Sequence, residues 1–242
     1  MRNVRSLGVV LGLTVSVGGG TAWAADYKVD PAKSSLVVQT FIGGMAGSLG
    51  HDHIVNATDY SGTIKFDPAA PDGTAVNVEV KTASLKADVP EVRKRFGYEK
   101  GPNEKDRAEI ESNMRAENQL HTSKYPTMSF VSTKVTKQGE GQFLVAGKLT
   151  IRGVTKDVSF PAKVVVEGNT VRGTGQLKFN QSSFGYSPYS AALGALKNKD
   201  EVVLHLDLVG VTDAAAAAPP PAATPVQATP AAQPAQPAPA KK

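Results

Sequence analysis

Alternation of apolar and polar residues runs through most of this chain and limits what it can fold into. In the stretch FLVAGKLTI, residues 143–151, every second position from Phe143 is apolar or glycine, while Lys148 and Thr150 hold the other parity. Successive side chains of a β-strand point to opposite faces, so this period predicts half-buried strands. Eight segments follow it: 35–42, 59–66, 76–81, 127–130, 143–152, 157–166, 171–179 and 201–208.

Short breaker sequences separate these segments and predict antiparallel neighbours, because tight turns join only antiparallel strands. The breakers are Asp67-Pro68, Asp72-Gly73, Gly139-Glu140-Gly141, Arg152-Gly153 and Glu167-Gly168-Asn169. An even number of strands with one apolar face fits an all-β, eight-stranded antiparallel barrel without open edges. A two-sheet sandwich has the same alternation and remains the alternative.

One charged segment interrupts the strand pattern. Residues 103–120 are rich in helix-forming residues and predict an exposed amphipathic helix inserted between strands, with Asn103 as its N-cap. The basic, glycine-containing residues 93–102 before it are expected to form a mobile loop. An eight-stranded barrel is just wide enough for side chains or one small ligand, and this helix and loop would cover one mouth as a lid.

Both ends of the chain differ from the middle. Residues 1–24 combine Arg2 and Arg5, a short apolar run and Ala22-Trp23-Ala24, which predicts a cleavable signal peptide. Residues 214–242 consist mainly of alanine, proline, glutamine and threonine, which predicts a disordered tail. One domain is therefore expected over residues 25–213. The absence of cysteine excludes disulfides, and for an exported protein this composition is typical of the bacterial periplasm.

The charge balance does not indicate a nucleic-acid-binding protein. The formal charge of +5 falls to about +3 without Arg2 and Arg5, and the lysines are spread along the chain. We therefore expect no nucleic-acid partner.

Two of the four histidines, His51 and His53, form a Gly-His-Asp-His motif after a glycine-rich approach. On one strand they would point to the same side and could share a metal ion, but a third ligand is not evident; His121, His205 and Asp59 are candidates in principle. Alternation along the strand predicts that both rings point to the outside of the barrel, unless a β-bulge turns them to the inner face. Local hydrogen bonding of two surface histidines is the simpler interpretation.

No catalytic motif or cofactor fingerprint accompanies these histidines. GGMAGSLG lacks the Gly-Lys-Ser/Thr ending of a phosphate loop, and no G-x-S-x-G elbow occurs. The expected function is therefore not enzymatic, and no cofactor is expected. Several strands instead carry glycines among valine and leucine, at Gly62, Gly147, Gly173 and Gly175, which favours a hollow interior.

The segment VAGKLTIRGVTKDVSFP, residues 145–161, resembles a hairpin of the YceI-like family of exported lipocalin-like proteins. Further pieces resemble that family in the same order along 27–211: DPAKSSLVV (30–38), YSGTIKFD (60–67), KYPTMSF (124–130), SSFGY (182–186) and KDEVVLHLDL (199–208). One departure is the Gly-His-Asp-His motif, where family members often have His-x-x-x-Ser. The alanine- and proline-rich tail also has no counterpart.

The resemblance implies a lipocalin-like barrel that holds an isoprenoid or other long-chain lipid-like ligand, in a periplasmic carrier protein. The implied lining consists of Val38, Ile64, Phe66, Val78, Val80, Met128, Phe130, Leu149 and Phe160. His51 and His53 are candidates for contacting the ligand head group. A metal-binding periplasmic protein that uses His51 and His53 is the alternative. The tail could contact an envelope or membrane-protein partner, and a homodimer is also compatible with the sequence.

Overall fold

The structure, a computed structural model, describes residues 25–44, 50–68 and 70–212. The predicted signal peptide and tail lie outside these residues. Among the described helices, none has the length and apolarity needed to cross a membrane.

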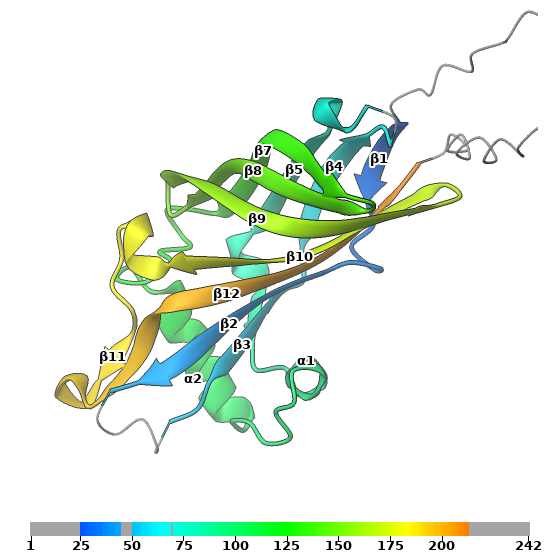
Figure 1. Ribbon diagram of the computed structural model, residues 1–242. Helices are drawn as coiled ribbons and strands as arrows, with labels where there is room; N and C mark the ends of the chain where they lie inside the picture. Colours follow the sequence, from blue (N-terminus) through cyan, green and yellow to red (C-terminus); the bar gives the residue numbers. More distant parts are fainter. Residues whose placement is uncertain (1–24, 45–49, 69, 213–242) are drawn as a thin grey trace, which may run out of the picture.

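Eight antiparallel strands close into a barrel (Figure 1). They follow the order β1-β4-β5-β7-β8-β9-β10-β12, and the pairing of β12 with β1 completes the circuit. This closure confirms the predicted eight-stranded barrel over the alternative sandwich. The strands are β1 (Ala25–Val29), β4 (Tyr60–Phe66), β5 (Ala75–Lys81), β7 (Thr127–Gly139), β8 (Gln142–Ile151), β9 (Val154–Glu167), β10 (Thr170–Asn180) and β12 (Leu196–Val211).

The sheet continues beyond the barrel as an extension of three further strands along β12, namely β2 (Ser35–Gly43), β3 (His53–Ala57) and β6 (Leu85–Ala87). A two-residue strand, β11 (Ser190–Ala191), also pairs with β12. Residues 210–211 of β12 pair with β1, whereas residues 197–207 pair with β2. β12 is long enough to hold β1 and β2 one after the other on the same edge. The predicted strand 35–42 therefore lies in the extension, and β1 takes its place in the barrel.

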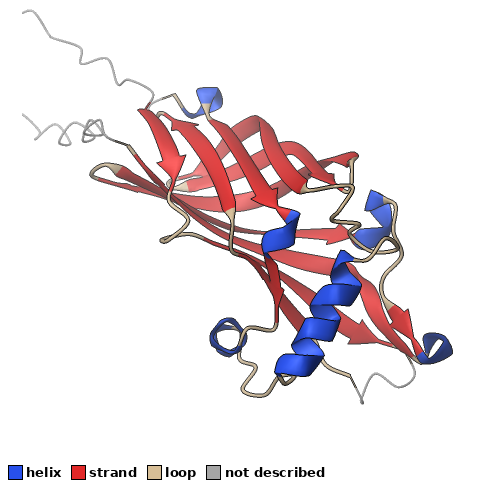
Figure 2. Ribbon diagram, turned by 180° about the vertical axis from the view of Figure 1, so that it is seen from behind, coloured by secondary structure: helices blue, strands red, loops and turns tan. Residues whose placement is uncertain are grey.

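Two helices accompany the extension. α2 (Glu104–Arg115) is the predicted inserted helix, and the side chain of its N-cap Asn103 accepts a hydrogen bond from the Asp106 N–H. It packs beside β6 and crosses that side of the molecule (Figure 2). α1 (Pro90–Arg95) was not predicted and includes the start of the segment expected as a mobile loop. Short 3-10 turns lie at Pro71–Gly73, Thr82–Ser84, Gln181–Phe184 and Ala192–Gly194.

Strand β8 shows how the alternation builds the core. Phe143, Val145, Gly147, Leu149 and Ile151 are buried, and the residues of the other parity are more exposed. The next turn, Arg152-Gly153, joins β8 to β9 with two residues. Both have positive φ, 53° and 74°, as a type I′ hairpin requires. The alternation of apolar residues and the two-residue turn therefore together fix the register of this hairpin.

The glycines expected to hollow the interior act in different ways. A Cβ at Gly147 would lie 2.5 Å from the Phe130 ring, and one at Gly175 would lie 2.8 Å from the Pro161 carbonyl oxygen. Gly62 is equally crowded, by the carbonyl oxygen of Asn77. Only Gly173 has open space beside it. The barrel does contain the expected hollow, but three of these four glycines do not border it, because neighbouring rings and strands occupy the space that a side chain would take.

Candidate functional site

An inner cavity of about 180 Å³ occupies the barrel. Valine, leucine, isoleucine and phenylalanine side chains form most of its lining, and Thr74 and Ser129 are its few polar lining residues. An apolar cavity of this kind cannot hydrogen-bond water and is suited to hydrocarbon.

A second cavity of about 320 Å³, here called the outer chamber, lies between the extension and α2. It shares part of its lining with the inner cavity: Val38, Val55, Leu85, Met128, Ile151 and Phe179. The remaining lining is mixed, with polar side chains from β2, β3, α2 and the loops around residue 186. The two cavities are therefore neighbours, and polar side chains gather in the lining of the outer one.

The structure places all nine predicted lining residues on the inner cavity. They are Val38, Ile64, Phe66, Val78, Val80, Met128, Phe130, Leu149 and Phe160. Val38 comes from β2 and therefore reaches the cavity from the extension. Their contact with a ligand remains a prediction.

The two motif histidines take different positions. His53 begins β3 and lines the outer chamber, whereas His51 precedes the strand, is exposed and does not line it. Their ring centroids are 4.7 Å apart. Burial and the adjacent His53 lower the pKa of His51 and favour its neutral form. The two rings are therefore close together although only His53 lies on a strand. The prediction had placed both histidines on the same strand.

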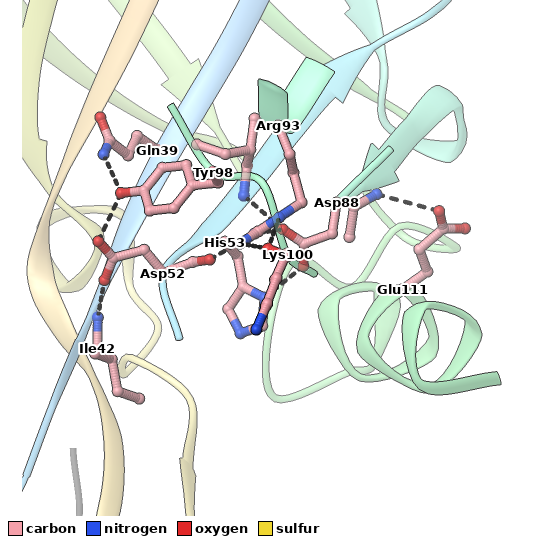
Figure 3. Close-up of polar contacts among 11 residues, drawn as sticks. Gln39, Ile42, Asp52, His53, Asp88, Arg93, Tyr98, Lys100 and Glu111 are labelled. Carbon is pink, nitrogen blue, oxygen red and sulfur yellow. Dashed lines mark hydrogen bonds and ion pairs between the residues drawn. The ribbon is translucent and has the colours of Figure 1, made fainter. Parts of the chain in front are cut away.

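His53 is held by a buried carboxylate from another part of the chain. Its Nδ1 lies 2.6 Å from Oδ2 of Asp88, which is 1% exposed (Figure 3). The other oxygen, Oδ1, accepts hydrogen bonds from the Ile54 N–H and from Arg93. Burial alone would raise the pKa of Asp88, but the donors His53, Ile54 and Arg93 hold it below its usual range.

Arg93 connects this carboxylate to the loop after α1. It is 3% exposed, and besides Asp88 its guanidinium donates to the carbonyl oxygens of Asp52 and Lys100. Its guanidinium carbon lies 4.8 Å from the centre of the Tyr98 ring. The segment expected to be a mobile loop is therefore anchored at Arg93.

Asp52, the central residue of the motif, has a structural role. Its carboxylate accepts hydrogen bonds from the Ile42 N–H and from the Tyr98 hydroxyl, which in turn accepts one from Gln39 (Figure 3). Gly-His-Asp-His therefore joins β2, β3 and the α1 loop through Asp52 and His53. Only His51 extends away from this network.

Sequence reasoning missed Asp88 and Arg93. Asp88 lies in KADVP outside the long alternating segments, and Arg93 belongs to a run that looks like a solvated basic loop. One signal was present: Pro90 favours the first position of a helix, and α1 begins there. Nothing in the sequence showed that residues 35 positions apart, His53 and Asp88, would meet.

Arg152 of the β8–β9 hairpin joins two segments whose neighbouring residues line the chamber. Its guanidinium donates to the carbonyl oxygens of Gly185 and Glu117, joining the residues after α2 to the loop after β10. Tyr186, next to Gly185, lines the chamber, and burial raises the pKa of its phenol. The hairpin therefore supports the chamber wall.

A protein-family model and several known proteins are similar to this chain in sequence. The model of the YceI-like domain matches residues 27–210. A UPF0312 protein of Photorhabdus laumondii is 32% identical over 196 residues, which cover 79% of this chain and 84% of the relative. Protein YceI of Escherichia coli O157:H7 is 31% identical over 164 residues, 66% of this chain and 74% of that protein.

Solved structures share the fold at lower identity. BcnA of Burkholderia cenocepacia has a TM-score of 0.59 and 22% identity, with 75% of this chain and 98% of that chain covered. The YCEI protein of Campylobacter jejuni has a TM-score of 0.50 and 22% identity, with 66% and 85% covered. Barrel, cavity and sequence match agree with a protein of the binding type. This chain belongs to the YceI-like family.

Proposed function

We propose that this protein is a periplasmic carrier that holds an isoprenoid or another long-chain lipid-like molecule, with its tail in the inner cavity and its head group in the outer chamber. The observation that carries the proposal is the difference in lining between two neighbouring cavities that share six lining residues. Hydrocarbon side chains surround the inner cavity, and His53, Gln119 and Asn198 are among the polar residues of the outer chamber.

Burial of the tail would supply most of the affinity. Each methylene transferred from water into an apolar site contributes about 0.8 kcal/mol. A few methyl-branched units therefore suffice for tight binding without any charged contact. This explains why the inner cavity needs no specific polar group to select a chain-like hydrocarbon.

Two polar groups on neighbouring strands support a head-group contact in the outer chamber. Thr40 pairs with His53 across β2 and β3, and both line the outer chamber. The Thr40 hydroxyl is buried and has no hydrogen-bond partner within the described part of the chain. A head group with oxygen atoms, such as a quinone or an amide, would satisfy it. His51, which lies outside the lining, is a weaker candidate for such a contact.

The proposed location rests on the sequence of residues 1–24 and on the absence of cysteine. Cell fractionation of the native host checks it: the protein is expected in the periplasmic fraction, shortened by the leader. Recovery from the cytoplasm with residues 1–24 attached would contradict it.

The binding proposal is tested with protein purified gently from its own host. Native mass spectrometry is expected to show a lipid-sized adduct. The delipidated protein is then titrated with an isoprenoid quinone and with a fatty amide. An empty barrel that binds neither compound would overturn the proposal.

A matched pair of variants locates the binding. Gly173→Phe places a ring in the open space beside Gly173 and is expected to weaken ligand binding at least tenfold. Val165→Phe adds a ring on the neighbouring strand at a position that is already exposed, and binding should stay unchanged. Equal affinities for both variants would place the ligand outside the barrel.

A further inference from the structure

His51, His53 and Asp88 form a compact cluster, of which His53 lines the outer chamber. A ring nitrogen of each histidine and a carboxylate oxygen of Asp88 lie within 4.8 Å of one another. We propose that His51 and His53 bind a transition-metal ion such as Zn²⁺ through one imidazole nitrogen each, and that Asp88 holds His53 in the orientation that binding requires. This site shares His53 with the outer chamber, but it does not depend on a lipid being bound.

The contact with Asp88 determines which nitrogen of His53 can bind a metal. Nδ1 faces the carboxylate at 2.6 Å, so a proton on Nδ1 is donated to Asp88. Nε2 then carries the lone pair that a metal needs. Metal-binding histidines commonly donate their second N–H to a carboxylate in this way, which fixes the tautomer and raises the basicity of the ligand.

Asp88 is itself fixed in place. Its backbone has a φ of 53°, which is rare for a residue with a side chain, and its carboxylate is held by Ile54 and Arg93. A strained, buried and fully hydrogen-bonded acid is a firm support for the imidazole beside it. The Arg93 charge is balanced by Asp88, so the pair leaves little net positive charge to repel a cation.

A small movement brings the two histidines to metal-binding distance. Two imidazole nitrogens on a tetrahedral Zn²⁺ lie about 3.3 Å apart, given bonds of about 2.0 Å. The rings are already in an edge-to-face arrangement with 65° between their planes. His51 is exposed and can turn about its side-chain bonds, while His53 stays fixed. The His51 side chain therefore makes the adjustment.

On the side of the outer chamber, the charges near His53 favour a cation. Asp106 and Glu109 of α2 line the same chamber as His53, and no lysine or arginine is among the described residues of that lining. Imidazole ligands select Zn²⁺, Ni²⁺ or Cu²⁺ over Mg²⁺ and Ca²⁺, which prefer oxygen. Two protein ligands leave further coordination positions for water or another oxygen ligand.

The test measures Zn²⁺ binding to the purified full-length protein, made without a polyhistidine tag, by isothermal titration. One Zn²⁺ per chain is expected. His51→Ala and His53→Ala should each weaken binding at least tenfold. His121→Asn is the matched control: it removes a histidine outside the cluster, and asparagine tolerates the positive φ at that position. Absence of binding to the unaltered protein, or undiminished binding to His51→Ala, would overturn the proposal.

Asp88 is tested as a positioning residue. Asp88→Asn keeps the size of the side chain and should weaken Zn²⁺ binding by about 10- to 100-fold. The ¹⁵N chemical shifts of His53, measured without metal, report its tautomer. In the unaltered protein they should show a single tautomer, with the proton on Nδ1 and the lone pair on Nε2. In Asp88→Asn they should show a mixture of the two tautomers. Unchanged shifts with weaker binding would contradict the positioning role. Lipid affinity is measured on the unaltered protein without metal, so failure of the metal proposal and failure of the carrier proposal are distinguishable.

Discussion

At the scale of single residues, Asp88 and Arg93 depend on each other, because each compensates a buried charge of the other. Arg93→Met removes the positive charge but keeps an apolar side chain of similar length. It leaves the Asp88 carboxylate buried without its cation, so the free energy of unfolding should fall by about 3–5 kcal/mol. Urea denaturation at neutral pH measures the loss.

The control is Arg172→Met, which breaks an exposed ion pair with Asp207 and should cost at most about 1 kcal/mol. Adding Asp88→Asn to Arg93→Met removes the unpaired charge and should restore part of the stability. Equal losses in Arg93→Met and Arg172→Met would show that the buried pair contributes no more than the exposed one.

The sequence predicted the lining of the inner cavity better than it predicted the hydrogen bonds around His53. The nine lining residues were identified because one parity of each strand and the family resemblance agreed, and all nine lie on the inner cavity. The partners of His53 could not be found this way. Hydrogen bonds between residues far apart in the sequence leave no periodic signal, and Asp88 and Arg93 resemble ordinary turn and surface residues. The crowded neighbourhood of Gly147 was hidden for the same reason, since it depends on where the Phe130 ring lies.

At the scale of elements, α2 and its attachment show what composition can predict. Helix formers and an asparagine cap were sufficient to predict the helix. Its docking depends on Glu111, whose carboxylate accepts hydrogen bonds from the Ala87 N–H of β6 and from Arg115, and pairs with Lys86. Similarly, the number of barrel strands was predicted correctly, but β2 was expected in the barrel where the structure has β1. That choice follows from the length of β12, which pairs with both.

The attachment of α2 is expected to depend on pH through Glu111. Burial opposes its ionisation, but the hydrogen bond from Arg115, with those from Ala87 and Lys86, holds the pKa of Glu111 below its ordinary value. The stabilisation is therefore complete above about pH 4.3 and is lost as the pH falls through the lowered pKa. Glu111→Gln should destabilise the protein by about 1 kcal/mol at pH 7, with the difference from the unaltered protein vanishing in stronger acid.

Urea denaturation of both proteins between pH 7 and pH 3 checks this dependence. Glu109→Gln, on the same helix, is the control, because Glu109 is exposed and has no ion pair among the described residues. A difference between Glu111→Gln and the unaltered protein that persists unchanged at pH 3 would show that the effect is steric rather than ionic.

At the scale of the whole molecule, the barrel is a closed sheet around a space that its own side chains do not fill. The inner cavity leaves apolar atoms without contacts on one side, which lowers the stability of the empty protein. A ligand that fills this space should therefore stabilise the entire fold, since the lining comes from most strands of the barrel and from β2, β3 and β6 of the extension.

Calorimetry of the delipidated protein should show this stabilisation directly. At a ligand concentration 100 times the Kd, binding to the folded state alone adds about 2.7 kcal/mol, which corresponds to a rise in Tm of roughly 5–10 °C for a domain of this size. Gly173→Phe should lose this ligand-induced rise, because the added ring occupies the open space beside Gly173. Without ligand, the variant should unfold at the same temperature as the unaltered protein or above it, since the ring fills part of the cavity. A full ligand-induced rise in Gly173→Phe would instead mean that the ligand stabilises the protein from another surface.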